Sequence, residues 1–261
     1  MREFIGELDF YYLPKVVRNM DYYCFADENV KNYVIENKIC EKERIFPTIP
    51  GSVFSGEFKP FEIKNKIRIC IPGIIDERKK NYIPVIEALN LIKNNIQHPI
   101  EIVLLGKPVG KYGQWVIDEF SKLDTENLSV ISFTGFVEQA KFNELMFGSH
   151  LLITPTKETT VFRIYKEIYG KTKASGSVGE MVKYGIPNLF PSYIYFDTEM
   201  ENIIDRYTTS QTLATELLKY INDIDYLNTR AQQVRGFVKE RYSVDIIAKK
   251  IDDFIKEKTL L

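Results

Sequence analysis

Short apolar runs alternate with longer amphipathic segments from about residue 67 onwards, and this alternation restricts the fold more than any other feature of the sequence. Strands are expected at residues 67–71, 100–105, 128–133, 151–154 and 188–190, and helices at 82–94, 112–123, 139–147 and 178–184. Strands that alternate with helices predict a parallel sheet with helices on both faces. The expected fold is α/β, a Rossmann-like doubly wound parallel sheet, followed by helices at 212–222, 226–242 and 244–256.

The first 60 residues follow a different pattern. A strand is expected at residues 22–26, a helix at 28–36 and a second strand at 44–46. Proline, glycine and serine are then frequent up to residue 60, as is typical of a linker. We therefore expect a small N-terminal α/β unit with a linker over residues 1–60, and the main domain over residues 61–261.

Composition disfavours several classes of protein. The chain has 35 Lys and Arg against 36 Asp and Glu, whereas proteins that coat nucleic acid usually carry a basic excess, so no nucleic-acid partner is expected. Cys24, Cys40 and Cys70 are widely spaced and no Cys–His cluster exists, so no metal site is expected. The sequence has no apolar stretch long enough to cross a bilayer and no signal-peptide pattern at its start, which predicts a cytoplasmic protein.

The loops that follow the expected strands are the first place to look for a ligand. Each of these strands ends at or close to a glycine or a proline. In open α/β sheets, ligands bind in the crevice beyond the carboxyl ends of the strands. The loops at residues 72–81, 106–111, 134–138 and 155–177 are therefore expected to converge on one site.

A Gly/Ser-rich turn with two lysines runs into the helix expected at 178–184. The amides and dipole at a helix start favour an anion, and small residues let a phosphate approach the backbone. The residues expected to hold a phosphate are Lys171, Lys173, Ser175, Gly176 and Ser177. Ser177 and Glu180 also match an S-x-x-E capping box, which needs no ligand, so both interpretations stay open. The spacing of a Walker A loop is absent.

A second basic loop lies between the first strand and its helix. Gly73 ends the strand, and Arg78, Lys79 and Lys80 follow. This run could equally be a solvated stretch in which Asn81 caps the helix. Two basic loops at the same edge of the sheet, beyond the carboxyl ends of the strands, favour a diphosphate ligand. No G-x-G-x-x-G motif follows the strand, so NAD binding is not expected.

Several segments resemble a known family in their order and spacing. They are residues 71–82, 104–106, 131–137, 151–156 and 179–187, the last reading GEMVKYGIP against a family pattern E-A-x-x-x-G-x-P. From about residue 67 to 256, the chain resembles the nucleotide-sugar-binding lobe of retaining GT-B glycosyltransferases of the broad family 4 group. The resemblance implies that the loop at Gly73 meets the donor phosphates, that Gly106 ends the second strand, and that Gly135, Phe136 and Val137 lie against the base.

The resemblance also implies a function. Glu180 would bind the donor ribose, and the amides just before it would hold the diphosphate. Glu180 and Lys80 are the expected catalytic residues, with Lys79, Lys171 and Lys173 as further cations beside the leaving diphosphate. The implied enzyme is a hexosyltransferase that retains the anomeric configuration. It would need no cofactor or metal, and would transfer sugar from a nucleoside diphosphate sugar to a polysaccharide or glycolipid precursor. No transmembrane segment is expected, and such an acceptor implies peripheral contact with a membrane.

The sequence departs from the family pattern at three places. Thr172 stands where the family's signature has its first Glu, Ile74 stands where an Arg is usual, and residues 1–60 resemble only the end of an acceptor lobe. A non-catalytic nucleotide-sugar-binding module is therefore an alternative. Another is one subunit of a split enzyme, with a partner chain or a second copy supplying the acceptor lobe. A receiver-type regulatory domain would need an acidic Mg²⁺ cluster, where this chain has basic loops.

Overall fold

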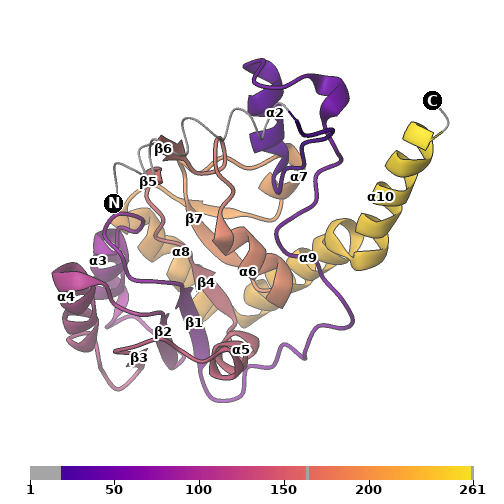
Figure 1. Ribbon diagram of the computed structural model, residues 1–261. Helices are drawn as coiled ribbons and strands as arrows, with labels where there is room; N and C mark the ends of the chain where they lie inside the picture. Colours follow the sequence, from indigo (N-terminus) through magenta and orange to yellow (C-terminus); the bar gives the residue numbers. More distant parts are fainter. Residues whose placement is uncertain (1–18, 163–164, 260–261) are drawn as a thin grey trace.

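A six-stranded parallel sheet forms the centre of the protein in the computed structural model, which describes residues 19–162 and 165–259 (Figure 1). Its strands are β1 (Ile67–Pro72), β2 (Ile100–Leu105), β3 (Leu128–Ser132), β4 (Leu151–Ile153), β7 (Asn188–Pro191) and β8 (Asp205–Tyr207). The order is β3-β2-β1-β4-β7-β8, and every pairing is parallel. This is the doubly wound Rossmann order, which places the ligand crevice where the winding reverses, beside β1 and β4. The predicted fold class is confirmed.

Helices cover both faces of the sheet. On one face pack α3 (Ile83–Ile92), α4 (Gly110–Ser121) and α8 (Ser210–Asn222), in one core with Ile67, Ile69 and Ile71 of β1. On the other face lie α5 (Gln139–Phe147) and α6 (Gly176–Tyr184), in a second core that contains Cys70 of the same strand. Because β1 and β2 are buried on both sides, they appear in the sequence as continuous apolar runs.

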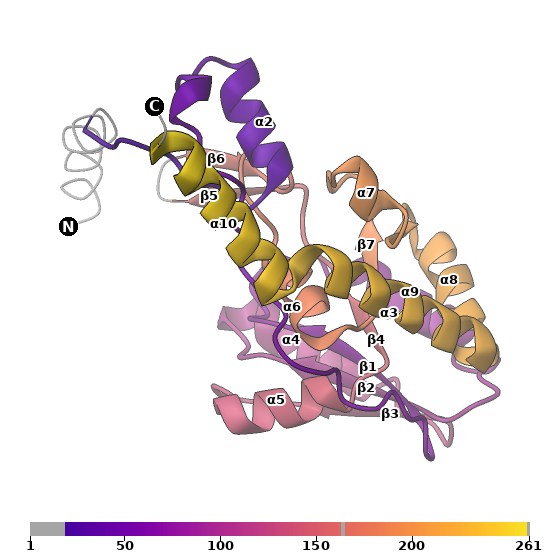
Figure 2. The ribbon, with the colours of Figure 1, turned by 90° about the vertical axis from the view of Figure 1, so that its right-hand side faces the viewer.

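The C-terminal helices reach back to the N-terminal segment. After α9 (Ile224–Tyr242), helix α10 (Val244–Thr259) runs away from the sheet towards α2 (Glu28–Glu36) and the short 3-10 helix η1 (Lys42–Arg44), as Figure 2 shows. The ring of Phe254 in α10 lies 5.2 Å from that of Tyr22 and 4.6 Å from that of Phe46, measured between centroids. Aromatic contacts thus attach the N-terminal segment to the last helix.

Phe54 connects the expected linker to the main body. Its amide donates to the oxygen of Tyr242 at 2.7 Å, and its oxygen accepts from the amide of Val244 at 3.0 Å. Its ring is buried in a core cluster with residues of α6 and α9. The boundary near residue 60 stays a prediction, but residue 54 already packs with the C-terminal helices.

Several local expectations were wrong. The strands expected at 22–26 and 44–46 are reduced to one bridge between Tyr23 and Ile45. The stretch expected to be a long loop holds an antiparallel hairpin of β5 (Thr159–Phe162) and β6 (Tyr165–Ile168). Helix α7 (Thr198–Glu201) and β8 were not expected. Such short elements depend on their neighbours, as β8 depends on pairing with β7, and leave little periodicity in the sequence.

Candidate functional site

A cleft of about 380 Å³ opens at the carboxyl ends of the first strands, beside α6. The loops after β1, β2 and β3 meet there with one side of α6 and with Ser52 from the N-terminal segment. Of the residues singled out in the sequence, the cleft brings together Gly73, Gly106, Phe136, Val137, Gly176 and Glu180. We refer to this space as the cleft.

Two glycines let the loops after β1 and β2 pass close together. Gly73 has a φ of +91°, in the region that favours glycine. A Cβ atom added to Gly106 would lie 2.1 Å from the main-chain oxygen of Gly73, which is far inside contact distance. The floor of the cleft therefore depends on bare backbone at both positions.

Lys80 lies beneath the loop that follows β1. Its side chain is buried, and its Nζ donates to the main-chain oxygens of Pro72 and, at 3.2 Å, of Gly73. Burial of the ammonium lowers the pKa of Lys80 to about 8, although Glu180 nearby opposes the shift. The alternative interpretation of this loop as a solvated run does not hold for Lys80, whose ammonium binds the backbone of the Gly73 turn. Its expected role as a catalytic residue stays a prediction.

The other two cations of this loop lie outside the cleft. Arg78 forms an ion pair with Asp76, with Nη2 2.6 Å from Oδ2, and this pairing holds the pKa of Asp76 below its usual range. Lys79 is exposed, and neither residue lines the cleft. Arg78 instead stabilises the turn after β1 through Asp76, whose Oδ1 also accepts from the Arg78 amide at 3.0 Å.

Helix α6 starts in the cleft with its first amides uncapped by a side chain. Ser175 is the N-cap residue, but its side chain makes no capping hydrogen bond. The predicted capping box of Ser177 and Glu180 is wrong, because the helix starts at Gly176 and both residues lie within it. The Val178 amide donates to the main-chain oxygen of Ser175 at 3.1 Å. The first amides of a helix have no partner inside it, so the Gly176 amide, which lies in the cleft, is available to a ligand. Gly179 lets Ser52 approach, since a Cβ there would be 2.7 Å from Ser52 Oγ.

Glu180 carries an unsatisfied acceptor at this site. Its Oε2 is buried and has no hydrogen-bond partner among the described residues. Burial raises the pKa of Glu180, while Lys80 and Lys183 act in the opposite direction. A buried acceptor without a partner costs free energy, about 1–3 kcal/mol or more for a charged group. A ligand with hydroxyl or N–H donors in the cleft would satisfy it.

The remaining predicted site residues lie away from the cleft lining. Gly135 is exposed, and Ser175 lines a different cavity described below. Lys171 is exposed, with Nζ 5.9 Å from the centroids of the Tyr33 and Tyr195 rings. Lys173 forms a backbone bridge with Tyr169, and the main-chain oxygen of Ser177 accepts from Asn188 Nδ2 at 3.4 Å. The basic turn before α6 thus presents its glycine, but not its lysines, to the cleft.

Thr172 is part of the turn after the β5–β6 hairpin. Its Oγ1 donates to Glu167 Oε2 at 2.6 Å and accepts from the Ile168 amide at 2.9 Å. The side chain therefore ties the second strand of the hairpin to the turn before α6. The Thr172 hydroxyl can form both bonds because it is a donor and an acceptor at once. This structural role in the turn was not evident from the sequence.

Sequence reasoning missed two cations that do line the cleft, Lys107 and Lys183. Lys107 follows Gly106 directly. Lys183 lies three positions after Glu180, and residues three apart share one face of a helix. Helical spacing could therefore have identified Lys183 once Glu180 was chosen.

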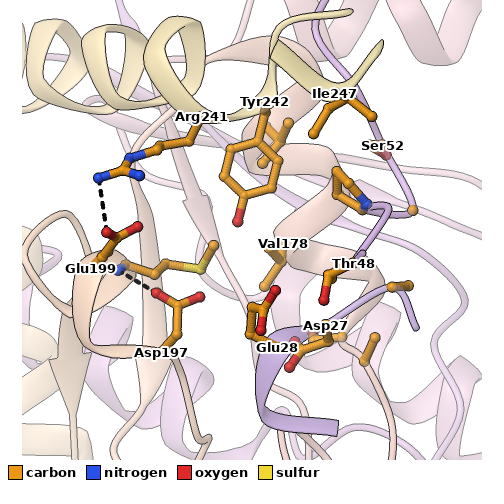
Figure 3. Close-up of a pocket in the computed structure, with 18 of the residues that line it drawn as sticks. Asp27, Glu28, Thr48, Ser52, Val178, Asp197, Glu199, Arg241, Tyr242 and Ile247 are labelled. Carbon is orange, nitrogen blue, oxygen red and sulfur yellow. Dashed lines mark hydrogen bonds and ion pairs between the residues drawn. The ribbon is translucent and has the colours of Figure 1, made fainter. Parts of the chain in front are cut away.

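A second and larger cavity, of about 600 Å³, lies on the other side of α6 (Figure 3). It shares Ser52, Gly176 and Gly179 with the cleft. Its charged lining residues are four carboxylates and two cations: Asp27, Glu28, Asp197, Glu199, Arg241 and Lys250. We call it the acidic cavity. Its excess of negative charge disfavours a phosphate ligand, so the smaller cleft, with Lys107 and Lys183, is the better candidate for an anion.

Over residues 19–162 and 165–259, no three His, Cys, Asp or Glu side chains are grouped so as to hold a metal ion. Across that same part of the chain, no helix is both long and apolar enough to pass through a bilayer.

Comparison with known proteins gives structural but not sequence relatives. No family model and no curated protein matches the sequence. The fold matches TarM (TM-score 0.62, 14% identity, 91% of this chain and 44% of TarM). It also matches Anabaena HepE in complex with UDP (TM-score 0.61, 13% identity, 92% of this chain and 64% of HepE).

A third similar structure is the pneumococcal O-GlcNAc transferase GtfA with UDP and GlcNAc (TM-score 0.63, 11% identity, 95% of this chain and 47% of GtfA). This chain therefore spans 44–64% of the length of these three proteins. The matches show that it has the α/β fold found in GT-B glycosyltransferases, over about half of their length.

Proposed function

We propose, starting from the fold that this chain shares with GT-B glycosyltransferases, that it binds a nucleoside diphosphate sugar in the cleft and serves glycosyl transfer. One observation carries the proposal most directly. Glu180 presents a buried carboxylate oxygen for which the described residues offer no hydrogen-bond partner, next to the uncapped start of α6. A hydroxyl-bearing group beside a diphosphate satisfies both features at once, because the carboxylate accepts hydrogen bonds while the helix start donates them.

The charges around the cleft support a ligand whose diphosphate lies at the start of α6 and whose hydroxyl-bearing group lies at Glu180. The diphosphate would lie at the Gly176 amide, at the start of α6, within the field of Lys183 and Lys107. The ribose hydroxyls would donate to Glu180. The base would lie against Phe136 and Val137, whose loop forms the opposite side of the cleft. Two of the similar structures contain UDP, which makes UDP the first nucleotide to test.

The same arrangement suits glycosyl transfer. When the bond between the anomeric carbon and the diphosphate breaks, negative charge grows on the leaving phosphate, and fixed amides at a helix start stabilise it. Lys80 would act indirectly by holding the Gly73 turn. We expect transfer with retention of anomeric configuration to a glycan or lipid-linked acceptor, without a metal ion.

A second candidate is a nucleotide-sugar-binding subunit without turnover of its own. The observation that favours it is Thr172, which stands where the family's signature has its first Glu and whose hydroxyl is engaged by Glu167 and the Ile168 amide. In that case a partner chain, or a second copy, would contribute the acceptor site. Binding of the donor is common to both candidates, and turnover separates them.

The test is calorimetric titration of the full chain with UDP, GDP, ADP and CMP. We expect one nucleoside diphosphate to bind, and Glu180→Gln to weaken it about tenfold, the effect of losing about 1.4 kcal/mol of hydrogen bonding. Glu144→Gln, at an exposed carboxylate on α5, is the matched control and should bind normally. If no nucleotide binds, the proposal is wrong.

Turnover is measured next, as release of the diphosphate from the sugar nucleotide that binds. Release that Glu180→Gln reduces identifies an enzyme. Tight binding without release identifies the binding subunit.

A further inference from the structure

Two helix-capping aspartates face the acidic cavity from opposite sides. Asp27 caps α2 through Oδ1, which accepts from the amides of Asn29 at 2.8 Å and Val30 at 3.3 Å. Asp197 caps α7 through Oδ1, which accepts from the Met200 amide at 2.8 Å. Within residues 19–162 and 165–259, the Oδ2 atoms of the two aspartates accept no capping hydrogen bond from an amide. Each carboxylate therefore keeps one oxygen for a ligand.

Tyr242 adds a hydroxyl to the same cavity. Figure 3 shows its phenol pointing from the α9–α10 junction towards the space between the two aspartates. The pKa of Tyr242 is raised by burial and by the surrounding carboxylates, which include Asp197 and Asp27, so the hydroxyl keeps its proton. A protonated phenol can both donate and accept a hydrogen bond.

The remaining charges are already partly engaged. Arg241 Nη2 lies 2.8 Å from Glu199 Oε1, and Glu28 forms an ion pair with Lys31. Lys250 is the other cation in the lining. Negative charge still exceeds positive charge. Burial raises the pKa of Asp27, and repulsion from Asp197 across the cavity adds to this shift. An anionic ligand would increase this repulsion, whereas a neutral ligand rich in hydroxyl groups would donate hydrogen bonds to the free oxygens.

The cavity and the cleft meet at the start of one helix. Ser52, Gly176 and Gly179 line both spaces. A ligand in the acidic cavity would therefore lie beside the end of α6 at which the diphosphate of the donor is proposed to lie. Two binding spaces on either side of one helix start are what a transfer between two substrates requires.

From this geometry we infer that the acidic cavity binds a neutral sugar of the acceptor, with Asp27, Asp197 and Tyr242 as its main hydrogen-bonding partners. That the bound sugar is the acceptor rests on the proposed function. Binding of a sugar in this cavity can be tested without the donor. The cavity volume of about 600 Å³ is large enough for one or two sugar rings.

The test uses saturation-transfer NMR on the full chain, with maltotriose and N-acetylglucosamine as neutral probes and a hexose phosphate as the anionic probe. Asp27→Asn and Asp197→Asn remove the charge but preserve helix capping, since Asn caps as well as Asp. Asp223→Asn is the matched control, because Asp223 caps α9 through the Tyr226 amide and does not line the cavity.

We expect a neutral probe to bind the wild type, and either cavity variant to weaken it about tenfold, as loss of a charge-assisted hydrogen bond does. Asp223→Asn should bind like the wild type, and the hexose phosphate should bind more weakly than the neutral probes. No binding of either neutral probe, tighter binding of the phosphate, or equal loss in Asp223→Asn would each overturn the inference.

Titration with UDP separates this inference from the proposed function. UDP affinity should be unchanged in Asp197→Asn. If UDP and sugar binding are lost together in that variant, the cavity belongs to the donor site and the inference is wrong. If UDP binds no form of the protein while the sugar results hold, the proposed function fails and the sugar-binding cavity stands.

Discussion

A Cβ atom on Gly106 would lie 2.1 Å from the main-chain oxygen of Gly73, so the turns after β2 and β1 touch through bare backbone. Gly106→Ala must push the two turns apart. We expect a loss of about 1–3 kcal/mol in the free energy of unfolding, the usual cost of overpacking, and weaker nucleotide binding. Urea denaturation and calorimetry measure the two effects.

Gly236→Ala is the matched control for that variant. Gly236 lies inside α9, and nothing lies within 4 Å of a Cβ placed there. Alanine favours a helix by up to about 1 kcal/mol over glycine, so this variant should be slightly more stable than the wild type. Equal stability of the two variants would show that the turns separate without cost.

Lys80 should make stability depend on alkaline pH. Its pKa is about 8 in the fold and about 10.4 in an unfolded chain. Between these values the unfolded chain holds the extra proton, so the contribution of Lys80 to the free energy of unfolding rises with pH. Buried tyrosines such as Tyr82 have raised pKa values and oppose this trend above about pH 10.

Lys80→Met isolates the contribution of the lysine. Between pH 8 and 10, we expect the wild type to gain stability relative to this variant, measured by urea denaturation at several pH values. The slope with pH is the readout, because methionine also removes the hydrogen bonds to the Pro72 and Gly73 oxygens. Parallel pH profiles for the two proteins would contradict a depressed lysine pKa.

Glu180 should make nucleotide affinity depend on acidic pH. Only the ionised carboxylate accepts hydrogen bonds with both oxygens, and burial raises its pKa. Affinity should therefore fall as the pH is lowered from 7 towards 5, where an ordinary glutamate would still be largely ionised. In Glu180→Gln the affinity should be low and should show no such fall. Calorimetry at each pH, at constant ionic strength, tests this.

Phe136 offers a test that leaves the fold intact. Its side chain is 88% exposed at the edge of the cleft, which is unusual for a phenylalanine. Phe136→Ala should change the free energy of unfolding by less than about 0.5 kcal/mol. It should weaken nucleotide binding about tenfold, because stacking of a base on an aromatic ring contributes about 1–3 kcal/mol.

Ile39→Ala serves as the control for Phe136→Ala, since Ile39 is also an exposed apolar residue but does not line the cleft. It should leave both stability and affinity unchanged. Normal nucleotide binding by Phe136→Ala would show that the base does not lie on this ring.

The main strands and helices could be predicted because their signals are local. Helix α5 has the predicted limits, and β2 does too, because runs of apolar residues and helical spacing survive in any context. The N-terminal strands and the capping box at Ser177 failed for the opposite reason. Each depended on the conformation of adjacent segments of the chain. The N-terminal strands form only one bridge, and helix α6 begins at Gly176 instead of after Ser177.

For the site, the sequence identified Gly73, Gly106 and Glu180 as residues of the strand ends and of the helix start. It could not tell which lysines face the cleft. A lysine side chain is long enough to reach solvent, a ligand or the backbone beneath a loop, and its position depends on how that loop packs. The backbone of Lys80 bridges to Thr156, and its buried ammonium donates to the Pro72 and Gly73 oxygens.

The sequence by itself determined the alternation of strands and helices and, with it, the edge of the sheet where a ligand can bind, because these follow from the period of the apolar residues. Only the tertiary structure decided that Lys80 is buried, that Lys183 faces the cleft, and that Asp27 and Asp197 meet across a cavity. The two aspartates are 170 positions apart, and only the packing of α2 and α7 around α6 and the α9–α10 junction brings their carboxylates together.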